Sequence, residues 1–186
     1  MQIIETPIFI PTMLMIGGST RNVGKTSLSC KIIEHFSKQI SIIGLKIKTI
    51  RENDSYFHGL EKKKLLGRFN IDEETDFEGI EDTSKMLRAG AKRVFRIKSK
   101  KEFLFDMFKE LIQIVPINSV FICESNSLRE FIKPGIFIII KEHGTMEMKP
   151  SARELEKFAD KIIFTDGNNH NFDFKTLKFE SSIWKL

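Results

Sequence analysis

The chain has little of what secreted, metal-binding or membrane-spanning proteins are built from. Its 186 residues include only two cysteines, Cys30 and Cys123, which lie in apolar stretches and lack metal-ligand spacing. Such a pair predicts reduced core thiols of a cytoplasmic protein. No apolar run reaches the ~18–20 residues that cross a membrane, and the longest, residues 136–140, has the length of a buried strand. The first residues carry Glu5 and no basic region before an apolar stretch, so we expect no signal peptide.

A strong charge imbalance is also missing. The formal net charge is +5, from 30 Lys and Arg residues against 25 Asp and Glu residues, and it is spread along the chain. The densest basic clusters are residues 62–68 and 98–101. Aromatic side chains do not alternate with these lysines as they do in nucleic-acid stacking platforms. We therefore favour a solvated face over a nucleic-acid interface.

What the chain does contain is a glycine-rich loop, residues 17–27, with the sequence GGSTRNVGKTS. An apolar run precedes it at 13–16, and apolar residues at helical spacing follow it. A loop between a strand and a helix presents backbone N–H groups and a helix N-terminus to a phosphate. In such a loop Lys25 would reach the β- and γ-phosphate oxygens, and Thr26 would bind Mg²⁺. The segment therefore predicts a phosphate-binding loop (P-loop) for a nucleotide.

The match to the pattern G-x-x-x-x-G-K-[ST] has one departure. Ser19 stands where the pattern has its first glycine, and Gly18 comes one residue early. The alternative is a glycine turn that caps a helix, with Lys25 in solvent. We favour the P-loop because strand, turn and helix fall where the motif needs them. The predicted nucleotide-binding residues are Arg21, Asn22, Val23, Gly24, Lys25, Thr26 and Ser27.

Strand-like and helix-like segments alternate along the chain. The predicted strands lie near 10–17, 40–48, 93–97, 118–123, 135–140 and 161–165, and a loose alternation over 176–184 predicts a terminal edge strand. The predicted helices lie near 24–38, 82–90, 101–114 and 151–159. Several strands are apolar on both faces, which suits a parallel sheet covered by helices on both sides. We expect an α/β fold in three layers with a mostly parallel central sheet, formed by residues 1–186 as a single domain. Its ligand would lie at the C-terminal strand ends.

Residues 51–81 have no clear periodic pattern. A loop of about thirty residues is long for a compact domain, and such loops are usually functional or disordered. We expect this segment to be a mobile loop on the substrate side of the site.

Polar residues at the ends of predicted elements supply the remaining candidates. Glu124 follows the apolar strand 118–123 and could hold Mg²⁺ or orient a water, although a surface or helix-capping glutamate would look the same. The polar run 125–127 after it favours a ligand-facing turn. Asp82 begins a predicted helix, where capping alone would also explain it. Lys46 and Lys48 alternate with apolar residues at a strand end and suit a phosphate or an anionic substrate, or a solvent-facing edge.

Two family resemblances sharpen these candidates. Residues 18–26 resemble the loop of dethiobiotin synthetase. Residues 44–48, and then 82–91 with Asp-Thr at the start and Ala-Gly-Ala at the end, are similar to the molybdopterin-guanine dinucleotide biosynthesis protein B family. The chain differs from both families in having Ser125, and not glycine, after the glutamate. The resemblance implies that Thr26, Asp82 and Glu124 surround Mg²⁺, that the protein forms a homodimer, and that it serves cofactor metabolism.

The sequence therefore predicts Mg²⁺-dependent binding of a purine nucleotide, ATP or GTP, with slow hydrolysis or phosphoryl transfer in which Lys25 and Glu124 are catalytic. One alternative is an ATP-dependent ligase or small-molecule kinase that holds a small-molecule substrate through Lys46, Lys48 and residues 51–81. Another is a non-enzymatic, nucleotide-gated adaptor. The choice between adenine and guanine stays open, because residues 141–143 and 165–168 could contact a base or be plain turns.

Overall fold

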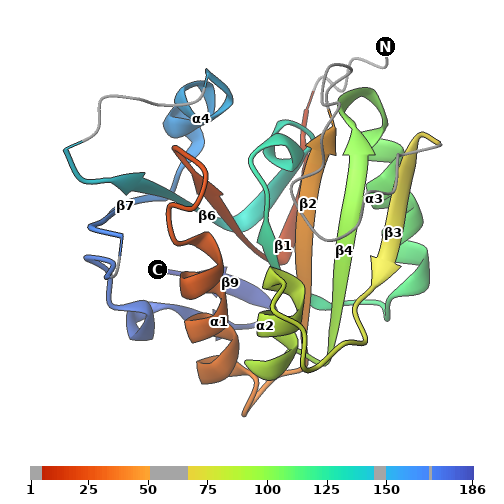
Figure 1. Ribbon diagram of the computed structural model, residues 1–186, viewed down its shortest axis with the longest axis horizontal. Helices are drawn as coiled ribbons and strands as arrows, with labels where there is room; N and C mark the ends of the chain where they lie inside the picture. Colours follow the sequence, from red (N-terminus) through yellow and green to blue (C-terminus); the bar gives the residue numbers. More distant parts are fainter. Residues whose placement is uncertain (1–5, 51–66, 145–149, 168) are drawn as a thin grey trace.

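The computed structural model describes residues 6–50, 67–144, 150–167 and 169–186. Within these residues seven strands form one sheet in the order β3-β4-β2-β5-β1-β6-β7 (Figure 1). Every neighbouring pair is parallel except β3 and β4. The strands are β1 (Ile8–Gly18), β2 (Ile42–Ile50), β3 (Phe69–Glu73), β4 (Arg93–Lys100), β5 (Val120–Glu124), β6 (Ile132–Glu142) and β7 (Lys161–Thr165). The helices are α1 (Lys25–Phe36), α2 (Asp82–Arg88), α3 (Leu104–Ile114) and α4 (Pro150–Leu155).

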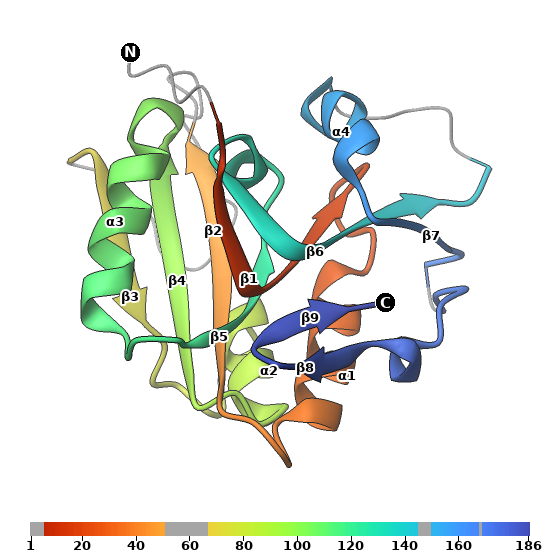
Figure 2. The same cartoon turned by 180° about the vertical axis from the view of Figure 1, so that it is seen from behind.

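The central strands are buried on both faces because each face is covered by different elements. Alternate residues of β1 point to opposite sides. Met13 and Met15 belong to a core that includes residues of α3 and α4, whereas Leu14 and Ile16 belong to a core with α1 and α2. Figure 1 shows α1 and α2 on the near face of the sheet, and Figure 2 shows α3 on the opposite face. Burying each such side chain stabilises the fold by about 1.5–3 kcal/mol. The predicted α/β class with a mostly parallel sheet is confirmed, and the arrangement is compatible with three layers.

The sheet order brings the carboxyl ends of β1 and β5 beside the middle of β2. Strand β5 lies between β1 and β2, and Glu124 is in register with Ile16 on one side and with Lys46 on the other. The glycine-rich loop follows β1 directly, and α2 begins beside the same edge. Residues from four separate parts of the chain are therefore neighbours at the carboxyl ends of the parallel strands, where ligands of open α/β sheets bind.

Two sequence predictions were wrong in part. Residues 51–81 are not one continuous loop, because β3 pairs antiparallel with β4 within that range; residues 51–66 lie outside the described part of the chain. The short alternation of Phe69 and Ile71 packs against the core and was hidden by the acidic residues around it. The segment 176–184 does not add an edge strand to the sheet.

The C-terminal segment instead forms a separate hairpin of β8 (Lys178–Glu180) and β9 (Ile183–Lys185). Ser181 and Ser182 have φ of 52° and 60°, which turns the chain back on itself. The indole N–H of Trp184 donates to the Thr12 carbonyl at 3.0 Å, and its ring meets Phe36 of α1 edge-on. Trp184 therefore joins the core that α1 covers, and the hairpin packs against α1.

The two cysteines are free thiols, as predicted, but only Cys123 is fully buried; Cys30 is partly exposed on α1. Short 3-10 helices complete the described structure, at Lys101–Phe103, Ser127–Glu130, Glu156–Phe158 and Phe174–Thr176. Across the described residues, none of the helices has the length and apolar character needed to cross a membrane.

Candidate functional site

The glycine-rich loop takes a conformation that requires glycine at two positions. Gly24, the N-cap residue of α1, has φ of 85°, a region that side-chain-bearing residues rarely adopt. Gly18 is required for space, because a Cβ there would lie 2.5 Å from Val23 Cγ1 and 3.0 Å from Lys25 Nζ. The Lys25 side chain therefore folds back over Gly18. This contact explains why glycine stands at position 18, while buried Ser19 is accepted at the next one.

The helix that follows the loop begins without a side-chain cap. Its N-cap residue, Gly24, has no side chain that could accept from the first N–H groups of α1. Those groups carry the partial positive charge of the helix terminus and suit an anion. The loop geometry thus meets the local requirements of a phosphate site.

The start of the loop is held by Asn126, which lies just beyond β5. The Gly18 N–H donates to Asn126 Oδ1 at 2.9 Å, and Asn126 Nδ2 donates to the Gly18 carbonyl at 3.0 Å. A Cβ on Gly17 would lie 2.7 Å from the same Asn126 oxygen. Ser125 is buried, and its hydroxyl accepts from the Leu128 N–H. The expectation of a ligand-facing turn was therefore wrong for Ser125, which is buried, whereas the half-buried Asn126 side chain holds the start of the glycine-rich loop.

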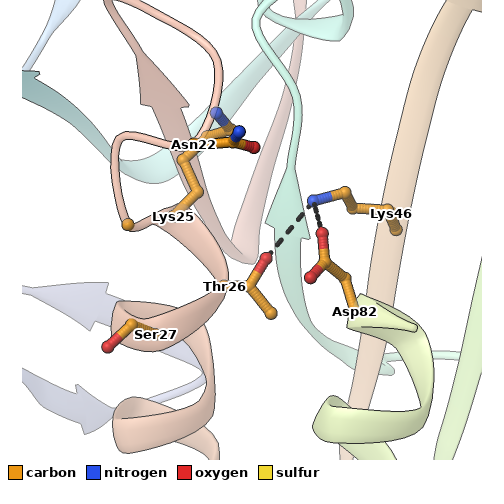
Figure 3. A pocket seen from close by; sticks show the side chains of 7 residues that line it. Asn22, Lys25, Thr26, Ser27, Lys46 and Asp82 are labelled. Carbon is orange, nitrogen blue, oxygen red and sulfur yellow. Dashed lines mark hydrogen bonds and ion pairs between the residues drawn. The ribbon is translucent and has the colours of Figure 1, made fainter. Parts of the chain in front are cut away.

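Lys46, predicted to hold a substrate, lies among Thr26, Asp82 and Glu124, the three residues predicted to surround Mg²⁺. Lys46 Nζ lies 2.5 Å from Glu124 Oε2, 2.7 Å from Asp82 Oδ2 and 3.3 Å from Thr26 Oγ1. The Thr26 hydroxyl also donates to Glu124 Oε2 at 3.1 Å. Figure 3 shows Lys46, Asp82 and Thr26 converging from β2, α2 and α1. We call Thr26, Lys46, Asp82 and Glu124 the oxygen–lysine cluster. Lys48 does not join it and is exposed on β2.

Because part of the oxygen–lysine cluster is buried, its charges must compensate one another. The Glu124 side chain has 0% of its surface exposed, against 27% for Lys46 and 40% for Asp82. A buried carboxylate is costly unless a partner compensates its charge, and Lys46 supplies that partner. Burial alone would lower the pKa of Lys46, but the Glu124 and Asp82 carboxylates outweigh it and hold that pKa above its usual value. Burial would raise the pKa of Asp82, yet the Lys46 ammonium holds it below its usual range.

A second carboxylate network fixes the start of α2. Buried Glu74, just after β3, accepts from the Thr83 hydroxyl at 2.5 Å and from the N–H groups of Thr75 and Asp76 at 3.1 Å and 3.0 Å. Arg96 of β4 lies 3.7 Å from the same carboxylate. These contacts tie the edge of the sheet to the first turn of α2 and so hold Asp82 in place.

A cavity of about 190 Å³ lies in front of the cluster. It is lined by Asn22 and Gly24 of the loop, by the first three residues of α1, and by Lys46 and Asp82 (Figure 3). Of the other predicted binding residues, Arg21 is exposed and does not line this cavity, and the Val23 side chain is buried in the core. Only the backbone of Val23 can therefore face a ligand.

His170, after β7, lies against the loop and was not among the predicted residues. A Cβ on Gly24 would be 2.8 Å from His170 Nε2, and both ring nitrogens are buried. Burial, together with the nearby Lys31 ammonium, lowers the pKa of His170. This places His170, two residues beyond the candidate base-contacting segment 165–168, directly beside Gly24.

The chain matches no protein-family model, and comparison with curated proteins and with solved structures gives no significant match either.

Proposed function

We propose that the protein binds the Mg²⁺ complex of ATP or GTP at the glycine-rich loop and slowly hydrolyses it or transfers its γ-phosphoryl group. In this proposal the α/β fold is a three-layer P-loop nucleotide-binding domain. The observation that carries the proposal is the convergence of the Thr26 hydroxyl and the Asp82 and Glu124 carboxylates beside the start of α1. A P-loop site combines a helix N-terminus and a hydroxyl with carboxylates near the metal; here Glu124 ends β5 and Asp82 begins α2.

The oxygen atoms of the cluster fit Mg²⁺, a hard cation that prefers oxygen ligands. Glu124 Oε1 is buried and has no hydrogen-bond partner among the described residues, so it can accept from metal-bound water. No group of three or more His, Cys, Asp or Glu side chains in the described ranges could hold a metal alone. Phosphate oxygens of the nucleotide would therefore complete the ligand set. When bound, Mg²⁺ neutralises charge on the β- and γ-phosphates.

The protein groups have distinct roles in this proposal. Lys25 and the N–H groups at the start of α1 bind phosphate oxygens and stabilise the negative charge that develops on the transferred group. Thr26 and Asp82 would be metal ligands. Glu124 is buried, and it would position the metal or the attacking water.

A second candidate is an ATP-dependent ligase or small-molecule kinase. The observation that favours it is the placement of Lys46 in the cavity wall, with exposed Lys48 two residues further along the same strand face. Two ammonium groups on that side would suit a carboxylate or phosphorylated co-substrate. Such an enzyme would turn over nucleotide much faster when its co-substrate is present.

A thermal-shift panel tests the proposal. We expect ATP or GTP with Mg²⁺ to raise the Tm, CTP to do so less, and EDTA to remove most of the effect. A ligand at about 100 times its Kd adds about 2.7 kcal/mol of stability, which such a panel detects. The proposal fails if no nucleotide raises the Tm in the presence of Mg²⁺. Phosphate release then separates an enzyme from an adaptor, which would bind nucleotide tightly without turnover.

A further inference from the structure

We propose that Lys46 is an internal cation that occupies the magnesium position and must leave when the metal enters with nucleotide. The ammonium and Mg²⁺ use the same oxygen atoms in turn. This inference rests on the proposed function and adds to it a control on metal binding.

The geometry of the oxygen–lysine cluster is that of a cation site. The three oxygens around Lys46 Nζ come from three different elements: the start of α1, the start of α2 and the end of β5. An ammonium carries three N–H donors, so the three acceptors satisfy it completely. One hydroxyl and two carboxylates are also the protein ligands that Mg²⁺ takes beside a phosphate.

The two cations cannot be present together. Magnesium–oxygen distances are about 2.0–2.1 Å, and the ion keeps several waters. Lys46 Nζ already lies 2.5 Å from Glu124 Oε2 and 2.7 Å from Asp82 Oδ2, so the hydrated ion would overlap the ammonium. The positive charges would also repel each other.

The cluster needs a cation even when no metal is bound. Two carboxylates lie next to each other, and the Glu124 side chain is fully buried. Without a positive partner their charges would repel in a region of low dielectric constant. Lys46 provides the compensation, and the register of β2 with β5 places it directly beside Glu124.

The cavity offers the displaced Lys46 ammonium a second position. Its side chain is 27% exposed and lines the cavity where the phosphates of a nucleotide would lie. A flexible four-carbon stem lets the displaced ammonium pair with a phosphate oxygen. Metal entry is therefore favoured when a phosphate is present to receive Lys46, which couples the binding of metal and nucleotide.

The test measures Mn²⁺ binding to nucleotide-free protein by electron paramagnetic resonance. The variants are Lys46→Met, which keeps the length of the side chain and removes its charge, and Lys38→Met as a control, because Lys38 is an exposed lysine beyond the C-terminal end of α1 and away from the cavity. We expect Lys46→Met to bind Mn²⁺ at least tenfold more tightly than the wild type, and Lys38→Met to bind as the wild type does. In EDTA, Lys46→Met should melt at a lower temperature and recover when Mn²⁺ is added.

Equal Mn²⁺ affinity in Lys46→Met and the wild type would overturn the inference. Tighter Mn²⁺ binding by the nucleotide-free wild type than by Lys46→Met would overturn it as well. Should Lys46→Met fail to fold, Lys46→Gln keeps two N–H donors for the carboxylates and gives the same comparison. The Mn²⁺ measurement needs no nucleotide. It therefore succeeds or fails separately from the proposed function, which a lack of nucleotide binding by the wild type would contradict.

Discussion

The side-chain amide of Asn126 pairs with the backbone of Gly18 through two reciprocal hydrogen bonds of 2.9 Å and 3.0 Å. The pairing of β1 with β5 ends at Ile16 and Glu124. Two residues further along both segments, the Asn126 side chain bonds to the Gly18 backbone where the glycine-rich loop begins. It fixes the position of Gly18, and Lys25 folds over Gly18. Asn126 thus connects the end of β5 to the geometry of the lysine in the loop.

We predict that Asn126→Ala destabilises the protein by about 1–3 kcal/mol, because the N–H and carbonyl of Gly18 lose their partners in a partly buried site. Urea denaturation measures the change. Asn70→Ala is the control, since the Asn70 side chain is exposed and donates to the nearby Asp72 carboxylate, and it should change stability by less than about 0.5 kcal/mol. Equal effects of the two substitutions would show that the amide pairing does not support the loop.

We predict that Glu124→Gln lowers the turnover of nucleotide much more than its affinity. The substitution keeps the shape of a fully buried side chain but removes its charge and with it the ion pair to Lys46. In the nucleotide complex the interaction lost is the one with the metal or the attacking water in the transition state. The measurements are kcat from phosphate release and Kd from calorimetry. Normal turnover combined with a much lower Tm would instead make Glu124 a structural residue.

The lowered pKa of His170 predicts a dependence of stability on pH. An unfolded histidine titrates near pH ~6.5. The folded protein resists that proton because the ring is partly buried and near Lys31, with the Gly24 backbone and Asp166 opposing the effect. Below about pH 6.5 the unfolded chain therefore binds more protons. The contribution of His170 to stability is present above this pH and is lost as the pH falls.

The comparison with His170→Gln isolates this effect from the other histidines, which are common to both proteins. Urea denaturation at about pH 7.5 and about pH 5.5 should show the wild type losing more stability than the variant on acidification. If both proteins lose the same amount, the contact of His170 with the glycine-rich loop has no influence on its titration.

The sequence predicted those features that depend on local pattern. Apolar runs such as 120–123 and 136–140 required burial on both faces, so the parallel sheet followed from them. Glu124 and Asp82 were recognisable because each stands at the end or the start of a predicted element. The spacing of Gly24, Lys25 and Thr26 placed the start of α1 correctly.

Features that depend on distant partners could not be predicted. Asn126 binds Gly18 across 108 positions of sequence, and no local pattern distinguishes it from a polar turn residue. Glu74 looked like one more solvated acid until β3 brought it to Thr83. The hairpin turn at Ser181 and Ser182 has positive φ values without the glycine or asparagine that usually announces such a turn.

The central claim is that Lys25 belongs to a nucleotide phosphate site, and calorimetric titration of ATP and GTP with Mg²⁺ tests it most directly. The proteins to compare are the wild type, Lys25→Ala, and Lys38→Ala, which removes an exposed lysine beyond the C-terminal end of α1. The account predicts binding by the wild type and by Lys38→Ala, and its loss in Lys25→Ala while the Tm without nucleotide stays close to that of the wild type. Wild-type nucleotide affinity in Lys25→Ala would contradict the account.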